Sequence, residues 1–174
     1  NGDIVDFYAL SRFMRNPKYR DLNEEIKIAN KFLDYLQAKF NRIIYKEGNH
    51  EKRLENYIFE QAPELAGIEG LGLRGLLQLE KRGIDFVNNR GLIKAGKLAI
   101  LHGNEINNGG IINVARIKIL RAMDNLLFAH HHVTQDFTLR KLFGETIGAW
   151  AVGCLCGLNP EYAKFNGWNH GFAI

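Results

Sequence analysis

The sequence predicts an α/β fold in which helices pack against a layered sheet. Short β-rich segments alternate with segments of helical periodicity along most of the 174 residues, and glycine-containing turns separate many of them. This alternation is typical of an α/β sheet rather than of a helical bundle or a barrel. A second observation supports it, because clusters of polar residues follow several of the predicted strands.

The first third of the chain is predicted to contain two helices with a strand between them. Residues 1–6 are typical of a strand end that enters a turn. Apolar side chains at helical spacing predict a helix over residues 22–40, and the β-rich run 42–45 predicts a short strand. The next helix is expected over residues 51–61, where Pro63 stops it.

The middle of the chain is predicted to be a loop, a short helix and two strands. Residues 67–75 are rich in glycine and are expected to form a loop, followed by a short helix over 76–82. Strands are expected over residues 84–87 and 97–101. The second of these strands ends just before a histidine.

The last third is predicted to return to the sheet. Helical spacing predicts a helix over residues 111–123, and the apolar run 125–129 predicts a strand. Residues 146–152 and 171–174 are expected to form two antiparallel strands joined by a loop. The prediction is therefore one domain covering residues 1–174, with strands at both ends.

Four polar clusters lie at the ends of these predicted strands. They are Asp3 with Asp6, Asn49 with His50, His102, and His130 with His132. Ligands of open α/β sheets gather beyond the carboxyl ends of strands, so the clusters can converge. Asp, Asn and His together suit a divalent transition metal better than calcium or a thiolate zinc site.

The clusters differ in how strongly they indicate metal binding. If residues 130–132 are extended, His130 and His132 point into one pocket and His131 points away. Asp3 and Asp6 could instead cap a helix, and His102 could be a histidine at the edge of the core. The four clusters in this order favour the metal interpretation over these alternatives.

The motifs resemble those of the calcineurin-like metallophosphoesterase superfamily, in its bacterial and phage branch. The matching strings are Gly2-Asp3-x-x-Asp6, Gly48-Asn49-His50-Glu51, His102-Gly103 and His130-x-His132. The resemblance spans nearly the whole chain and implies a layered β-sandwich flanked by helices. Two departures stand out: Ala129 replaces the usual glycine, and the family's first motif, Asp-x-His, has no counterpart. The domain is therefore expected to lack its first strand, and the C-terminal end is also expected to be incomplete.

The resemblance implies two divalent cations, for which Mn, Fe, Zn and Ni are all candidates. Asp3 would bridge them, Asn49, His102 and His130 would complete the second site, and His132 would serve the first. Without the Asp-x-His motif, the first site is expected to be incomplete in this chain.

The implied reaction is hydrolysis of phosphate mono- or diesters by a metal-activated hydroxide. His50 would assist the leaving group, with Asp6 holding its imidazole, while Arg12 and Arg53 are candidates for substrate contact. The expected partner is a phosphoester substrate, with nucleic acid among the candidates, and its identity would depend on the loops 61–75 and 105–110.

Bulk properties fit a protein outside the membrane. No run reaches the roughly 18 apolar residues of a membrane span, and Asp3 and Asp6 interrupt the only early apolar stretch. Cys154 and Cys156 are too few for a disulfide framework, so a cytoplasmic location is expected. Buried core thiols are expected here rather than a shared zinc site.

Two other functions compete with the phosphoesterase interpretation. Residues 70–75 fit Gly-x-Gly-x-x-Gly, the dinucleotide fingerprint, but no convincing strand precedes them and no acid lies about 20 residues further on. The second is a non-catalytic metal-binding module that binds nucleic acid, which the net charge of +4 and the missing motif keep open.

Overall fold

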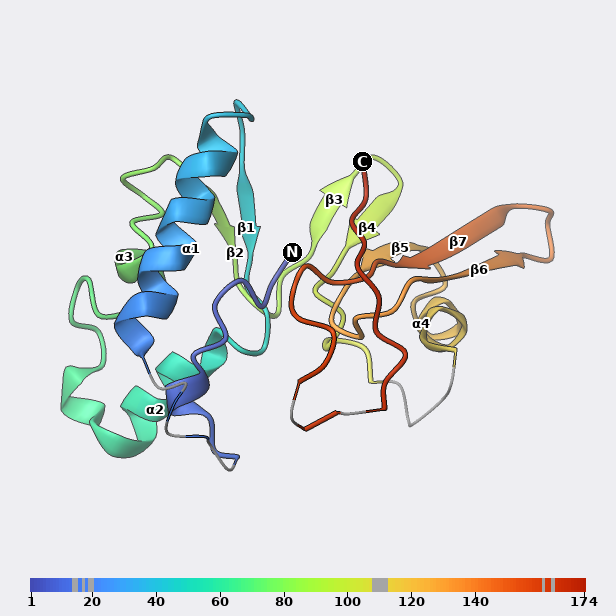
Figure 1. Cartoon of the computed structure of the whole chain (residues 1–174). Coiled ribbons are helices and arrows are strands. Elements are labelled where there is room, and N and C mark those ends of the chain that lie inside the picture. The colour runs from blue at the N-terminus through green and yellow to red at the C-terminus, as the bar shows by residue number, and fades with distance from the viewer. Residues whose placement is uncertain (14–15, 17, 19–20, 108–112, 161, 164) are drawn as a thin grey trace. The chain divides into compact units, whose positions relative to one another are not determined.

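The computed structural model describes residues 1–174 except 14–15, 17, 19–20, 108–112, 161 and 164. Its residues form two compact units. The N-terminal unit is Gly2–Asn89, and the C-terminal unit is Arg90–Ile174 together with Asn1. Each unit has its own buried apolar core and its own helices and strands (Figure 1).

The N-terminal unit places three helices around a small parallel sheet. Its elements are η1 (Tyr8–Leu10), α1 (Leu22–Gln37), β1 (Ile44–Lys46), α2 (Lys52–Gln61), η3 (Pro63–Leu65), α3 (Leu73–Leu76) and β2 (Asp85–Val87). β1 and β2 pair in parallel, with Tyr45 opposite Phe86. The predicted helices at 22–40 and 51–61 and the strands at 42–45 and 84–87 are confirmed, with bounds shifted by up to three residues.

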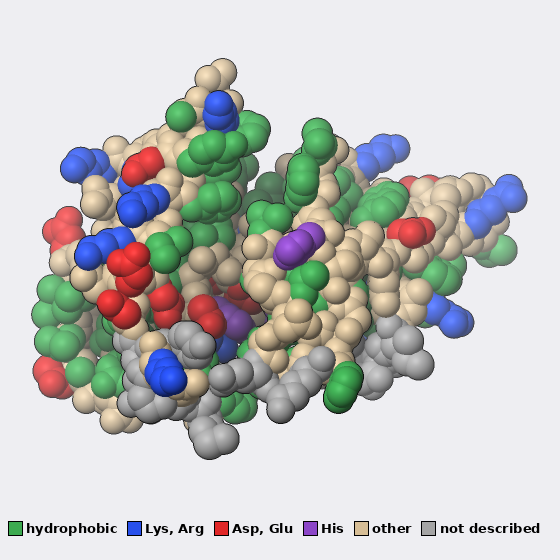
Figure 2. Space-filling model, viewed as in Figure 1, with side chains coloured by type: hydrophobic (Ala, Val, Ile, Leu, Met, Phe, Trp, Pro, Cys, Tyr) green, Lys and Arg blue, Asp and Glu red, His purple; other side chains and the backbone are tan. Residues whose placement is uncertain are grey.

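The helix α1 begins at a polar cap and buries one stripe of its surface. The Asp21 side chain accepts a hydrogen bond from the backbone N–H of Glu24 at 2.9 Å, which satisfies one of the helix's unpaired donors. Ala29 and Leu33 are buried in the core that also holds Tyr45. Lys, Arg, Asp and Glu side chains are interspersed on the face of the unit that carries α1, as expected of a solvated helix surface (Figure 2).

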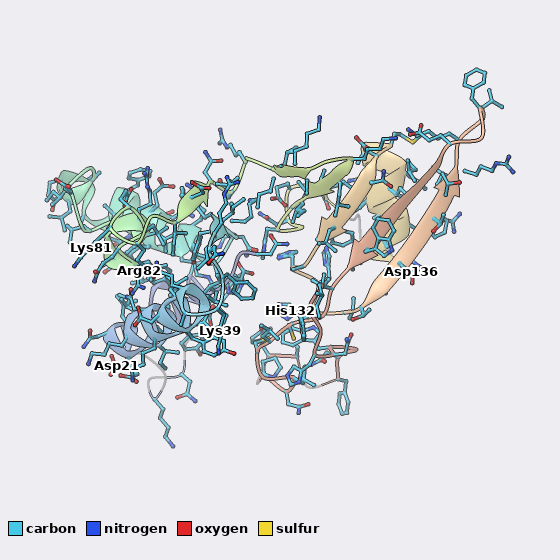
Figure 3. The ribbon with its side chains drawn as sticks, turned by 90° about the horizontal axis from the view of Figure 1, so that it is seen from above. Asp21, Lys39, Lys81, Arg82, His132 and Asp136 are labelled. Atoms are coloured by element: carbon cyan, nitrogen blue, oxygen red, sulfur yellow. The ribbon has the colours of Figure 1, made fainter. Side chains whose placement is uncertain are left out.

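The short helix predicted at 76–82 is wrong: α3 ends at Leu76 and turns follow it. Gln78 has a φ of 53°, a left-handed conformation that ends the helix. Arg82 then anchors the turn on α1, where its guanidinium donates to Asp34 at 2.5 Å and to Gln37 at 2.7 Å. Figure 3 labels Arg82 beside α1.

The C-terminal unit is a mixed five-stranded sheet with one helix. Its elements are β3 (Ile93–Ala95), β4 (Leu98–Ile100), α4 (Val114–Ala122), β5 (Asn125–Phe128), β6 (Gln135–Arg140) and β7 (Thr146–Ala151). The strand order is β3-β4-β5-β7-β6, in which β5 runs parallel to β4 and β7 while the outer pairs are antiparallel. Ala115 and Ile119 of α4 are buried against Phe128 and Ala149 of the sheet.

Strands β4, β5 and β7 and helix α4 confirm the predicted elements, and the start of that helix prediction, residues 111–112, lies outside the described residues. Two outer strands, β3 and β6, were missed. In the other direction, the predicted strand at 171–174 is wrong, because those residues have no regular structure and only His170 bridges to Cys154.

The predicted α/β class is confirmed at the level of mixed helices and sheets, with one five-stranded mixed sheet and one small parallel sheet. The finer expectation, a β-sandwich flanked by helices, stays a prediction. None of the helices in the described part of the chain has the length and apolar character that crossing a bilayer requires.

Candidate functional site

A buried carboxylate organises the first polar cluster in the N-terminal unit. Glu51, only 1% exposed, lies at the start of α2. Its Oε2 accepts hydrogen bonds from the backbone N–H groups of Asp3 and Gly48, both at 2.9 Å. Its Oε1 accepts from Ile4 N at 2.7 Å and from the Tyr45 hydroxyl at 2.9 Å. Glu51 therefore joins the turn that carries Asp3 to the turn that precedes α2.

The sequence did not predict that Glu51 joins the two turns; it showed Glu51 only as the last residue of the Gly48-Asn49-His50-Glu51 motif. The available signal was an acid three residues after a glycine turn at the start of a helix. The pKa of Tyr45 is raised well above its ordinary value. Burial of the hydroxyl is the largest cause, and the negative charge of Glu51 is the next.

Gly48 is required by the close approach of these two turns. A Cβ at this position would lie 2.2 Å from Asp3 Oδ1 and 2.5 Å from the Asp3 backbone nitrogen. Asp3 itself has a left-handed φ of 53°, and its Oδ1 accepts a hydrogen bond from the backbone N–H of His50 at 2.9 Å. The turn thus holds the Asp3 carboxylate against the backbone at His50.

The contact predicted between Asp6 and His50 is present. The imidazole Nδ1 of His50 lies 2.7 Å from Asp6 Oδ1, and its Nε2 lies 3.8 Å from Asp3 Oδ2. Burial raises the pKa of Asp6, but the hydrogen bond and charge of His50 and the charge of Arg53 outweigh it, so the net pKa is lowered. Asp6 is therefore ionised and accepts a hydrogen bond from Nδ1–H, which leaves Nε2 to face Asp3.

The other predicted residues of this unit have contacts of their own. Arg53 donates to the Asp6 backbone oxygen at 2.8 Å and also pairs with the Asp6 carboxylate. Arg12 is exposed, and its guanidinium carbon lies 5.8 Å from the centre of the Phe13 ring. Asn49 is half-buried in the turn before α2. A role in substrate or metal binding stays a prediction for all three.

The C-terminal unit brings two predicted ligands together. His102 follows β4 and is 1% exposed. Its Nδ1 lies 2.9 Å from the backbone oxygen of Asn1, and its Nε2 lies 3.2 Å from His130 Nδ1. A carbonyl oxygen only accepts, so the network assigns the proton of His102 to Nδ1 and leaves the Nε2 lone pair directed at His130.

The loop after His102 is held by buried charges. Glu105 accepts hydrogen bonds from the backbone N–H groups of His102 at 3.1 Å and Gly103 at 2.7 Å. Lys118, fully buried on α4, donates to the backbone oxygens of Gly103 and Ile106. The loop that presents His102 is therefore fixed from both sides.

Burial gives Lys118 a measurable pH signature. Desolvation lowers its pKa from 10.5 to about 8, with a smaller opposite effect from Glu105. Between these values the unfolded chain holds a proton that the native state releases, so stability is expected to rise with pH across the window. The relative gain is up to about 3 kcal/mol by pH 10.5. Urea unfolding at pH 7.5 and 9.5 should show most of this gain in the wild type and none of it in Lys118→Met. An equal change in unfolding free energy in both proteins would contradict the prediction.

The extended conformation predicted for residues 130–132 is wrong. His130 and His132 have left-handed φ values of 64° and 59°, and His131 N donates to Ala129 O across a tight turn. β5 ends at Phe128 and the chain turns at once, so residues 130–132 do not continue the strand. His131 packs on Phe128, and burial with neighbouring positive charges lowers its pKa to about 3, so it is neutral.

The two outer histidines have different neighbours. His130 contacts His102, whereas a ring nitrogen of His132 and the thiols of Cys154 and Cys156 all lie within 4.8 Å of one another. The prediction that the two cysteines are buried core thiols without a shared site is wrong. Residues 154–156 lie beyond the end of β7 in a turn, and Cys156 is exposed.

A pocket of about 880 Å³ lies beneath the glycine-rich loop of the N-terminal unit. Its walls include Lys52, Phe86 and residues 65–75, which run from the end of η3 into α3. Most of the segment 61–75, which is expected to influence substrate choice, therefore lines a pocket, although Asp6 and His50 are not among its lining residues.

The predicted metal ligands are divided between the two units: Asp3 and Asn49 belong to the first, and His102, His130 and His132 to the second. Their convergence on one centre stays a prediction. Comparison with models of known protein families, with curated proteins and with solved structures gives no match.

Proposed function

We propose that the chain is a metal-dependent phosphoesterase of the calcineurin-like type, which hydrolyses phosphate mono- or diesters. The observation that carries this proposal is the histidine pair of the C-terminal unit. His102 Nε2 and His130 Nδ1 approach to 3.2 Å, and the other nitrogen of His102 is held by a backbone carbonyl. A carbonyl partner that fixes the tautomer of a ligating histidine is a recurring feature of metal sites.

The geometry of the pair fits a cation. Two imidazole nitrogens bound at tetrahedral angles to one zinc ion lie about 3.3 Å apart, close to the 3.2 Å observed here. The Asn1 carbonyl holds the proton of His102 on Nδ1, so Nε2 is the nitrogen that would bind a metal. The donor set is thus suited to a borderline divalent metal.

The remaining ligands are carried over from the resemblance. Asp3 would bridge two cations, Asn49 would join the histidine pair on one, and His132 would serve the other. When bound, the cations would supply an activated water for in-line attack and would neutralise charge on the phosphoryl oxygens. The finer fold, a β-sandwich flanked by helices, belongs to the same proposal.

The proton chemistry would fall to His50. Its Nδ1 donates to the Asp6 carboxylate at 2.7 Å, so Nε2 is the nitrogen that faces the predicted bridging residue Asp3. From that position the doubly protonated ring would donate its Nε2 proton to the leaving oxygen while Nδ1–H stays bound to Asp6. Arg53 supports the arrangement by binding the Asp6 backbone oxygen at 2.8 Å, which keeps the acceptor in place.

The test measures metal and turnover together. After loading with Mn²⁺ or Zn²⁺, the protein is expected to retain metal and to hydrolyse aryl phosphate mono- or diesters. His130→Ala should lose turnover and the metal held by the histidine pair, since it removes half of the nitrogen pair. His131→Gln is the matched control, because this neighbouring histidine has no role in the proposed reaction, and it should keep most of both.

A protein that holds metal but cleaves neither aryl esters nor DNA would contradict the proposal. Salt-dependent DNA binding without cleavage would instead favour the non-catalytic nucleic-acid module.

A further inference from the structure

The geometry points to a zinc site formed by His132, Cys154 and Cys156, in addition to the histidine pair of the proposed phosphoesterase. One ring nitrogen of His132 and the two sulfur atoms lie within 4.8 Å of one another. Cys156 Sγ lies 4.0 Å from His132 Nδ1. In a tetrahedral zinc site such atoms lie roughly 3.6–3.8 Å apart, so the ligands need to close by only about 1 Å.

The backbone around these ligands is held by one segment, residues 168–171. Asn169 N donates to His132 O at 2.9 Å, and Cys154 N donates to Asn169 O at 2.9 Å. The Asn169 side chain also accepts from Thr134 N at 2.8 Å. The backbones of His132 and Cys154 are therefore both hydrogen-bonded to Asn169 before any metal binds.

The close packing of this frame is built into the sequence. A Cβ on Gly153 would lie 2.3 Å from Asn169 O, so only glycine lets the cysteine segment approach. The Trp168 ring packs edge-on against the His132 ring at 4.1 Å between centroids and fixes its plane. Figure 3 shows His132 beyond the end of β5, beside the C-terminal coil.

Backbone strain adds a second indication. His132 has a left-handed φ of 59°, a conformation that costs about 1 kcal/mol or more in a residue with a Cβ. Such conformations persist where the surroundings impose them, and they cluster at ligand sites. Here the strained turn directs the imidazole at the two thiols.

The ligand set selects the metal. Two thiolates and one imidazole suit Zn²⁺, whereas carboxylate and amide oxygens suit harder cations. Binding forms two S–Zn bonds and one N–Zn bond, and both thiol protons pass to solvent. In the described part of the chain no fourth His, Cys, Asp or Glu side chain joins this group, so a water would complete the coordination.

The site can be read by cobalt substitution in the full chain under a reducing agent. Since the chain has only two cysteines, any thiolate-to-cobalt charge-transfer absorption must come from Cys154 and Cys156. One equivalent of Co²⁺ is expected to produce this absorption with tetrahedral d–d bands, and one equivalent of Zn²⁺ should abolish both. Absence of the charge-transfer band in the folded wild type would overturn the site.

Serine variants identify the ligands. Cys154→Ser and Cys156→Ser are each expected to weaken Zn²⁺ binding by at least roughly 100-fold. Removing a residue that only hydrogen-bonds to a ligand costs about 10–100-fold in affinity, and removing the ligand itself costs more. Unchanged affinity in either variant would also overturn the site. If a variant fails to fold, zinc protection of both wild-type thiols against alkylation replaces this measurement, and failure to protect them counts against the site.

The outcome is separable from that of the proposed function, although the two share His132. His130→Ala removes a ligand of the proposed phosphoesterase site and should leave the thiolate absorption intact. If the protein fails to hydrolyse esters, the thiolate-to-cobalt absorption is still expected. If that absorption is missing, ester turnover is still expected.

Discussion

Replacement of Glu51 by glutamine is expected to destabilise the N-terminal unit by about 3 kcal/mol. The carboxylate accepts hydrogen bonds from four backbone N–H groups and the Tyr45 hydroxyl while it is 1% exposed. A glutamine of the same size would turn an amide NH₂ toward backbone donors, so at least one buried N–H would lose its acceptor. Urea unfolding followed by circular dichroism measures the change.

Two variants act as controls. Glu55→Gln changes an exposed carboxylate on the same helix and should shift stability by no more than about 0.5 kcal/mol. Tyr45→Phe removes one of the five donors and should cost about 1 kcal/mol. An unfolding midpoint of Glu51→Gln equal to that of Glu55→Gln would show that the carboxylate does not organise the turn.

The second large effect is expected at the catalytic step. If the proposed function holds, His50→Ala should lower ester turnover by roughly 10²–10⁴-fold, the usual contribution of a positioned acid or base. The imidazole is held by Asp6 at 2.7 Å, and no ligand role is assigned to it, so bound metal should stay at the wild-type amount. Steady-state rates with an aryl phosphate and metal analysis of the same sample give both values.

Asp6→Asn separates orientation from proton transfer. The amide oxygen can still accept from Nδ1 but carries no charge, so a smaller loss than in His50→Ala is expected. A His50→Ala protein that loses its metal would identify His50 as a ligand and contradict its assignment to the leaving group.

Much of the fold was accessible from the sequence because it depends on local patterns. The apolar stripe of α1, the proline after α2 and the β-rich runs of β1, β4, β5 and β7 all encode burial along one element. The outer strands β3 and β6 were missed. The residues of β6 alternate between half-buried and exposed, and β3 is only partly apolar, so neither strand carries a clear apolar pattern. Pairing with a neighbouring strand stabilises them.

The candidate site divides along the same line. Chemically distinctive residues after predicted strands identified His102, His130 and the Asp6–His50 pair. His102 and His130 do follow β4 and β5, whereas residues 1–6, predicted as a strand end, form no strand. The sequence by itself determined the α/β class and these candidate groups. Only the tertiary structure decided that Glu51 joins two turns and that His132 faces Cys154 and Cys156. These contacts depend on left-handed turns and on backbone segments far apart in the chain, which no periodicity encodes.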